Sequence, residues 1–108
     1  MSQPMIIGNW KMNTTIEEAK RLAEAIKLRL ETVDGIRKVV CPPLVSLAHV
    51  AEVLRGSSIS LGAQNMHFEE KGAFTGEVSP EMLAGICQLV ILGHSERRQY
   101  FHLSLIHI

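Results

Sequence analysis

A histidine directly behind a buried strand is the residue in this sequence with the clearest chemical potential. His94 follows the apolar stretch 89–92, and Ser95 and Glu96 behind it are residue types that begin helices. Backbone N–H groups at a helix start carry partial positive charge, so they disfavour protonation of a nearby imidazole. We therefore predict a neutral imidazole near pH 7 that can donate a hydrogen bond to a substrate carbonyl. The alternative is that His94 caps a helix or packs at the end of the strand.

A second group of polar residues follows the first apolar stretch, residues 5–7. Asn9 and Lys11 stand there, and parallel α/β folds bind their substrates at the carboxyl ends of the strands. A lysine ammonium neutralises a phosphate or a developing enolate oxygen, and an asparagine amide orients the lysine or the substrate. Taken separately, Lys11 could be a solvated loop lysine and Asn9 a turn former. If the strands are parallel, both residues share one end of the sheet with His94.

Four repeats of a strand followed by a helix are expected to position these residues. The strands are predicted at 5–7, 39–41, 59–63 and 89–92. Apolar strands that alternate with amphipathic helices are typical of a parallel sheet covered by helices. Right-handed crossovers leave an open doubly wound sheet or a barrel, and the Gly-x-Gly-x-x-Gly fingerprint of dinucleotide folds is missing.

The first helix and one long loop carry further local predictions. A threonine at 14 or 15, with a glutamate three residues later, predicts a capping box. The helix stripe expected to face the core consists of Ile16, Ala19, Leu22, Ala23, Ile26 and Leu30. Residues 64–79 show little periodicity, and so long a loop inside a compact domain is usually functional or interfacial.

Composition limits the partners and the compartment. The 108 residues fit one domain, and 11 basic against 11 acidic residues leave no net field toward nucleic acid or a membrane. No secretory signal or membrane-spanning apolar run is visible. Cys41 and Cys87 are far apart in the sequence and form no Cys-x-x-Cys pair. We predict that both are buried thiols in a reducing compartment, and we expect that compartment to be the cytoplasm. Neither His49 nor His67 has a partner at metal-ligand spacing, so we expect no metal site.

Three motifs in this order resemble the triosephosphate isomerase family. They are Gly-Asn-Trp-Lys-Met-Asn at 8–13, Gly-Ala-Phe-Thr-Gly-Glu at 72–77, and Leu-Gly-His-Ser-Glu-Arg-Arg at 92–98. The resemblance covers about 4–101 and implies an α/β fold, the first four βα units of a (β/α)8 TIM barrel. It also implies a glycolytic and gluconeogenic isomerase of dihydroxyacetone phosphate and glyceraldehyde 3-phosphate, acting through an enediol(ate) with no metal or organic cofactor. That family is the standard example of a neutral histidine at a helix start, so the electrostatic argument for His94 adds no independent support.

The resemblance also assigns roles to matching residues. Asn9 and Lys11 match substrate-binding positions, where Lys11 stabilises negative charge on the substrate oxygens. His94 matches the electrophile that donates to the carbonyl oxygen and moves protons between the two oxygens. Ser95 and Glu96 match positions behind these, and Glu96 is expected to pair with Lys11. Members of the family are homodimers, and the positions here that match the interface are Gln64, Asn65, Thr75 and Gly76.

The chain also departs from the family pattern. A complete barrel has about 250 residues and eight strands, whereas this chain supplies four. The glutamate base, the mobile lid and the phosphate-binding loops are not among them, so we expect an N-terminal fragment that is inactive alone. Residues 102–108 are apolar where a polar-faced helix is expected, and we interpret them as an atypical tail on a half-barrel domain of 1–101.

An isolated half-barrel suggests a second hypothesis. Strands one and four are expected to present unpaired edges, because only closure removes the edges of a barrel. The chain could therefore be a non-catalytic assembly module that uses these edges and the loop 64–79. A third hypothesis is a different phosphosugar enzyme on the same barrel.

Overall fold

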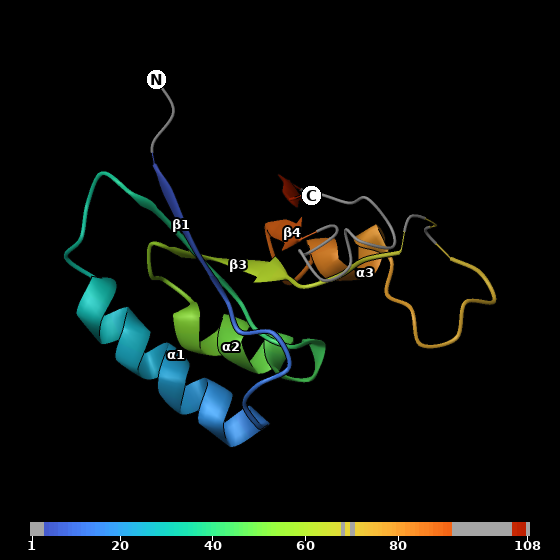
Figure 1. Ribbon diagram of the computed structural model, residues 1–108, viewed down its shortest axis with the longest axis horizontal. Coiled ribbons are helices and arrows are strands. Elements are labelled where there is room, and N and C mark those ends of the chain that lie inside the picture. The colour runs from blue at the N-terminus through green and yellow to red at the C-terminus, as the bar shows by residue number, and fades with distance from the viewer. Residues whose placement is uncertain (1–3, 68, 70, 92–104, 108) are drawn as a thin grey trace.

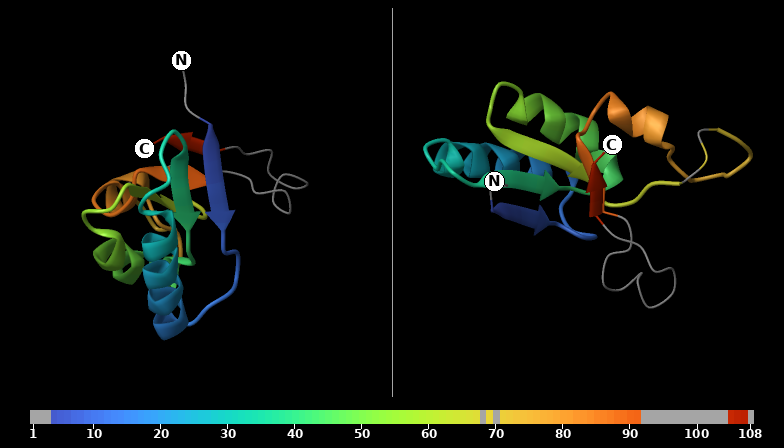
Figure 2. Two further views of the ribbon diagram at one scale, coloured as in Figure 1. Left: turned by 90° about the vertical axis from the view of Figure 1, so that its left-hand side faces the viewer. Right: turned by 90° about the horizontal axis from the view of Figure 1, so that it is seen from above.

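The computed structural model describes residues 4–67, 69 and 71–91, together with the backbone of 105–107. The elements in chain order are β1 (Met5–Asn9), α1 (Ile16–Leu30), β2 (Arg37–Cys41), the 3-10 helix η1 (Leu44–Ser46), α2 (Leu47–Leu54), β3 (Ile59–Ala63), α3 (Pro80–Ala84), β4 (Leu89–Ile91) and β5 (Leu105–His107). They form one sheet in the order β1-β2-β3-β4-β5. The pairs β1–β2, β2–β3 and β3–β4 are parallel. The helices lie along one side of the sheet (Figure 1, Figure 2), which confirms the predicted parallel α/β architecture.

The edge of β4 is covered, so the predicted unpaired edge at the fourth strand is wrong. Strand β5 pairs antiparallel with β4 and places Ile106 opposite Val90. The tail is apolar and β-branched, a composition that favours strands, and its partner here is β4 of the same chain. No strand pairs with the outer edge of β1 within the described residues. There Ile6 is 58% exposed.

Helix α1 begins with the predicted capping box. Of the two threonines, Thr15 is the N-cap: its hydroxyl accepts from the Glu18 N–H at 3.3 Å, and its own N–H donates to the Glu18 carboxylate at 2.8 Å. These bonds favour the charged carboxylate, and the Thr15 backbone N–H is the main reason why the pKa of Glu18 lies below its ordinary value. In the predicted stripe Ala19 and Ala23 are buried, whereas Leu22 is 39% exposed.

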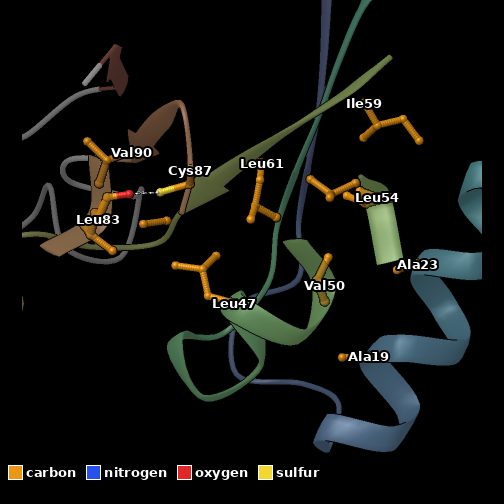
Figure 3. Packing of buried hydrophobic residues seen from close by; sticks show 12 residues of the cluster. Ala19, Ala23, Leu47, Val50, Leu54, Ile59, Leu61, Leu83, Cys87 and Val90 are labelled. Carbon is orange, nitrogen blue, oxygen red and sulfur yellow. Dashed lines mark hydrogen bonds between the residues drawn. The ribbon is translucent and has the colours of Figure 1, made fainter. Parts of the chain in front are cut away.

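The main core lies between the sheet and the helices (Figure 3). Strand side chains Val40, Leu61 and Val90 pack there in one cluster with α2, and Ala19 and Ala23 belong to the same cluster. A second cluster of Val39, Cys41 and Leu89 is also buried. Successive residues of a strand point to opposite sides, so the second cluster lies on the face of the sheet away from the helices.

A buried lysine ties the first helix to the third strand. Lys38 is only 5% exposed. Its ammonium donates to the carbonyls of Leu30 at 2.9 Å and Val33 at 2.7 Å, and to the Ser58 hydroxyl at 2.8 Å. A cation at the C-terminal end of a helix complements the helix dipole and satisfies carbonyls that have no partner inside the helix. The contact therefore fixes α1 against the start of β3.

Within the described residues, no helix combines the length and the apolar character that crossing a membrane requires.

Candidate active site at the carboxyl ends of the strands

Asn9 shapes the loop that follows β1. It is the last residue of that strand and lies opposite Cys41, the last residue of β2. Its side-chain oxygen accepts from the Lys11 backbone N–H at 2.9 Å. The Trp10 N–H donates to the Cys41 carbonyl at 3.1 Å, and the Asn13 side chain returns to the Trp10 carbonyl at 2.9 Å. Asn9 therefore forms a turn, which is one of the two alternatives predicted for it. This turn carries Lys11.

Lys11 has a backbone conformation that non-glycine residues rarely adopt. Its φ is +54°, in the left-handed region. Such a residue costs of order 1–3 kcal/mol and persists only where the surrounding contacts determine it. These contacts lie on both sides of the residue: the Asn9 side chain accepts from its N–H, and the Gln64 side chain donates to its carbonyl at 2.8 Å. The residue itself is exposed, so the strained backbone presents a lysine at the end of the sheet.

Gln64 connects the ends of three strands. It follows β3 directly, and its amide nitrogen donates both to the Lys11 carbonyl at 2.8 Å and to the Cys41 carbonyl at 2.9 Å. Sequence reasoning placed Gln64 only at the base of an interfacial loop and missed this contact. The available signal was a glutamine immediately behind a strand, at the sheet end where a polar loop also follows β1.

The predicted residues His94, Ser95 and Glu96 lie outside the described residues. Strand β4 is described up to Ile91, and it runs parallel to β3 with Val90 opposite Ala63. Ile91 is therefore at the same end of the sheet as Asn9, Lys11 and Gln64.

The long loop behind β3 is irregular where it is described, as predicted. A hydrogen bond from the His67 N–H to the Val78 carbonyl, at 2.7 Å, closes its base. Thr75 and Gly76 are exposed in a turn, and the φ of +85° at Gly76 explains the glycine there. Phe74 stacks on His67 with 4.3 Å between the ring centroids. Figure 1 shows the loop projecting away from the sheet.

The hollow beside this loop involves the predicted interface residues. Its volume is about 240 Å³, and its lining includes Gln64, Asn65 and Gly76 from the loop, Leu44 of η1 and Leu47 of α2. Leu44 is 55% exposed.

The two cysteines are free and buried, as predicted. Burial raises the pKa of Cys41 to about 12, and the proximity of Cys87 adds to this. Cys87 directs its thiol to the Leu83 carbonyl at 3.5 Å (Figure 3). In the described part of the chain, no three His, Cys, Asp or Glu residues gather closely enough to hold a metal ion.

Comparison with known proteins points to one family. A model of the triosephosphate isomerase family matches residues 4–107. Triosephosphate isomerase of Dehalococcoides mccartyi is 60% identical over 101 residues, which are 94% of this chain and 40% of the relative. The enzyme of that name from Carboxydothermus hydrogenoformans is 56% identical over 102 residues, with 94% and 41% covered. The crystal structure of triosephosphate isomerase from Bartonella henselae superposes with a TM-score of 0.84 at 37% identity, covering 94% of this chain and 42% of that one. The chain thus spans about 40% of the length of these relatives.

Proposed function

Because the chain belongs to the triosephosphate isomerase family, we propose that it supplies the N-terminal half of an active site that interconverts dihydroxyacetone phosphate and D-glyceraldehyde 3-phosphate. The observation that carries the proposal is the placement of Lys11. The parallel strands bring it, in a strained and doubly held conformation, to the sheet end where β4 also terminates. Substrates of parallel α/β folds bind at that end.

The residues of this chain divide the chemistry as follows. The Lys11 ammonium attracts the substrate phosphate and the negative charge that develops on the enediolate oxygens, and Asn9 holds the turn that carries it. A neutral His94 donates a proton to the carbonyl oxygen while a base removes the proton from the adjacent carbon. The neighbouring oxygen then returns its proton to the imidazole, and the base returns its proton to the other carbon. Overall, no proton is gained or lost.

The base is the part that these residues do not supply. No glutamate here matches it, and a general base commonly contributes about 10²–10⁴-fold to the rate. We expect no measurable isomerase activity from the purified 108-residue chain in a coupled assay. Turnover by this chain alone would show that the assignment of the base is wrong.

A chimera tests the function directly. The matching segment of this chain would replace the 101 aligned residues of the Dehalococcoides mccartyi relative, which is 60% identical there. We expect isomerase activity, and a loss of at least about 10²-fold in Lys11→Met, because charge stabilisation at the reacting oxygens is typically worth that much. Lys20→Met, at a half-exposed position on α1, is the control. A folded but inactive chimera, or an active Lys11→Met variant, contradicts the proposal.

We also propose that the complete protein is a homodimer. The support is the exposed turn at Thr75 and Gly76 and the hollow of about 240 Å³ beside Asn65, which offers a partner's loop a place to bind. Thr75→Arg in the chimera should raise the fraction of monomer in sedimentation, and Thr75→Ser should not. Equal dimerisation of the two variants contradicts this interface. The two buried, unpaired cysteines favour a reducing compartment, and on that ground we propose the cytoplasm.

Of the two unpaired strand edges on which the assembly-module hypothesis depends, only the edge of β1 is unpaired among the described residues. Strand β5 covers β4, and the exposed Met5, Ile6 and Ile7 of β1 remain as a possible contact surface. Gel filtration and amide exchange on the 108-residue chain test it. We expect poor folding or self-association, and a monodisperse monomer with slowly exchanging strands refutes that expectation. The family match favours triosephosphate isomerase over another phosphosugar enzyme.

A further inference from the structure

We propose that Gln64 is a positioning residue for Lys11 and acts through the backbone without touching the substrate. The inference rests on the proposed function, because the placement of Lys11 matters for catalysis only if its ammonium binds the substrate. Nothing in the residue type alone assigns this role to Gln64. The assignment follows from two hydrogen bonds that its amide nitrogen donates, to the carbonyl of Lys11 and to the carbonyl of Cys41.

Hydrogen bonds on both sides of the Lys11 Cα restrain both of its backbone dihedral angles. The N–H of Lys11 belongs to the peptide group before its Cα, and that N–H is held by the Asn9 side chain at 2.9 Å. The carbonyl belongs to the peptide group after the Cα, and it is held by Gln64 at 2.8 Å. Because each peptide group is planar, these two hydrogen bonds restrain φ and ψ of Lys11. They thereby restrain the direction in which the lysine side chain leaves the backbone.

The side chains of Asn9 and Gln64 together form a clamp on Lys11, and the second hydrogen bond of Gln64 anchors this clamp to the sheet. The Cys41 carbonyl accepts from Gln64 at 2.9 Å and from the Trp10 N–H at 3.1 Å. It is the last carbonyl of β2, so the loop behind β1 and the end of β3 share one fixed point on the strand between them. Replacing Gln64 would remove a hydrogen bond to the carbonyl of Lys11, and the left-handed φ of +54° at Lys11 costs energy to maintain.

The amide group of a glutamine suits this geometry. Both hydrogens of its amide group can be donated, one to each carbonyl. Glutamate has a similar shape but offers no donor when ionised, and its charge would face two carbonyl oxygens. Leucine retains similar bulk without either hydrogen bond.

The test uses the chimera described above with two glutamine variants. Gln64→Leu is expected to lower kcat/KM roughly 10- to 100-fold, since a misplacement of about 1 Å can cost 10²-fold. Gln88→Leu is the matched control: Gln88 also binds a backbone group, the Leu61 N–H at 2.9 Å, but at the start of β4. We expect this control to change kcat/KM less than about threefold. A Gln64→Leu variant as active as the control overturns the proposal.

A double-mutant cycle separates positioning from general loss of structure. In the Lys11→Met background, Gln64→Leu should lower the remaining activity less than about twofold, because residues that act as one unit are not additive. A full loss in that background would show that Gln64 does not act through Lys11.

A measurement independent of catalysis completes the test. In the chimera with isotope-labelled lysine, the Cα and Cβ chemical shifts of Lys11 report its left-handed conformation. Gln64→Leu should move them toward the values of ordinary lysines, and Gln88→Leu should not. Unchanged shifts in Gln64→Leu overturn the proposal. If the unmodified chimera is inactive, the proposed function fails, and the shifts still decide whether Gln64 positions Lys11.

Discussion

A single added methyl group at Gly62 should disturb the end of the sheet that carries the candidate site. Gly62 lies in β3, two residues before Gln64. A Cβ there would lie 2.7 Å from the Cys41 sulfur, 3.5 Å from a methyl carbon of Val39 and 3.6 Å from the Leu89 carbonyl oxygen. The first distance is too short for any real contact, so Cys41 or β3 has to move.

The expected cost follows from the burial of the sulfur. Cys41 is 0% exposed, so its side chain has no open space into which it can turn. Inserting a methylene into a packed core typically costs about 1–3 kcal/mol. Replacing glycine restricts the unfolded chain and returns about 0.4–1 kcal/mol. We therefore expect Gly62→Ala to lower the free energy of unfolding by about 1–2 kcal/mol.

Guanidinium unfolding of the chimera, at one fixed protein concentration, measures this change. Gly8→Ala in β1 is the matched control, because a Cβ there would meet nothing closer than the indole nitrogen of Trp10 at 3.6 Å. Removing the sulfur should restore the room, so Gly62→Ala should cost almost nothing in a Cys41→Ala background. The coupling between the two sites should reach about 1 kcal/mol.

Two outcomes would refute the reasoning about Gly62. One is an equal loss of stability from Gly62→Ala with and without the Cys41 sulfur, which would place the cost elsewhere. The other is a loss from Gly8→Ala as large as that from Gly62→Ala, which would make the effect a general property of glycine in this sheet.

Three further predictions concern charge and burial. Lys38→Met should lower the free energy of unfolding by about 2–3 kcal/mol, because it leaves buried acceptors without a donor. Lys20→Met, at a half-exposed position, should change it by less than about 0.5 kcal/mol in denaturant titrations. The lowered pKa of Glu18 stabilises the fold at pH values above its ordinary pKa of 4.5, and this stabilisation is lost as the pH falls through the folded-state pKa. The difference in unfolding free energy between the parent and Glu18→Gln should therefore shrink on acidification. Cys41, with a pKa of about 12, should resist iodoacetamide until the protein unfolds, and rapid modification of the native protein would contradict this.

Local rules located most of the elements from the sequence. The predicted capping box, for example, joins Thr15 and Glu18, which are three positions apart. The predicted strand 59–63 coincides with β3, because a short apolar run between glycine and polar residues has few alternatives. These signals are complete within a few residues, and a single sequence therefore contains all that is needed to interpret them.

The features that sequence reasoning missed depend on contacts between distant residues. The clamp joins Gln64 to acceptors 53 and 23 positions away, and a glutamine side chain does not indicate its acceptors. Strand β5 shows the same limit: the composition of 105–107 favours a strand, but only the folded chain shows that its partner is β4.

Hydrogen bonds that hold the Lys11 backbone join residues between positions 9 and 64. Asn9, Trp10, Cys41 and Gln64 provide them. The backbone that carries the ammonium should therefore keep its geometry in the chimera, whichever relative supplies the second half. The opposite holds for the base, which the second half must bring to the substrate. Replacing the second half by that of a more distant relative should change the rate of proton transfer more than the Lys11 chemical shifts. Lys11 shifts that vary with the second half would show that the clamp is not sufficient.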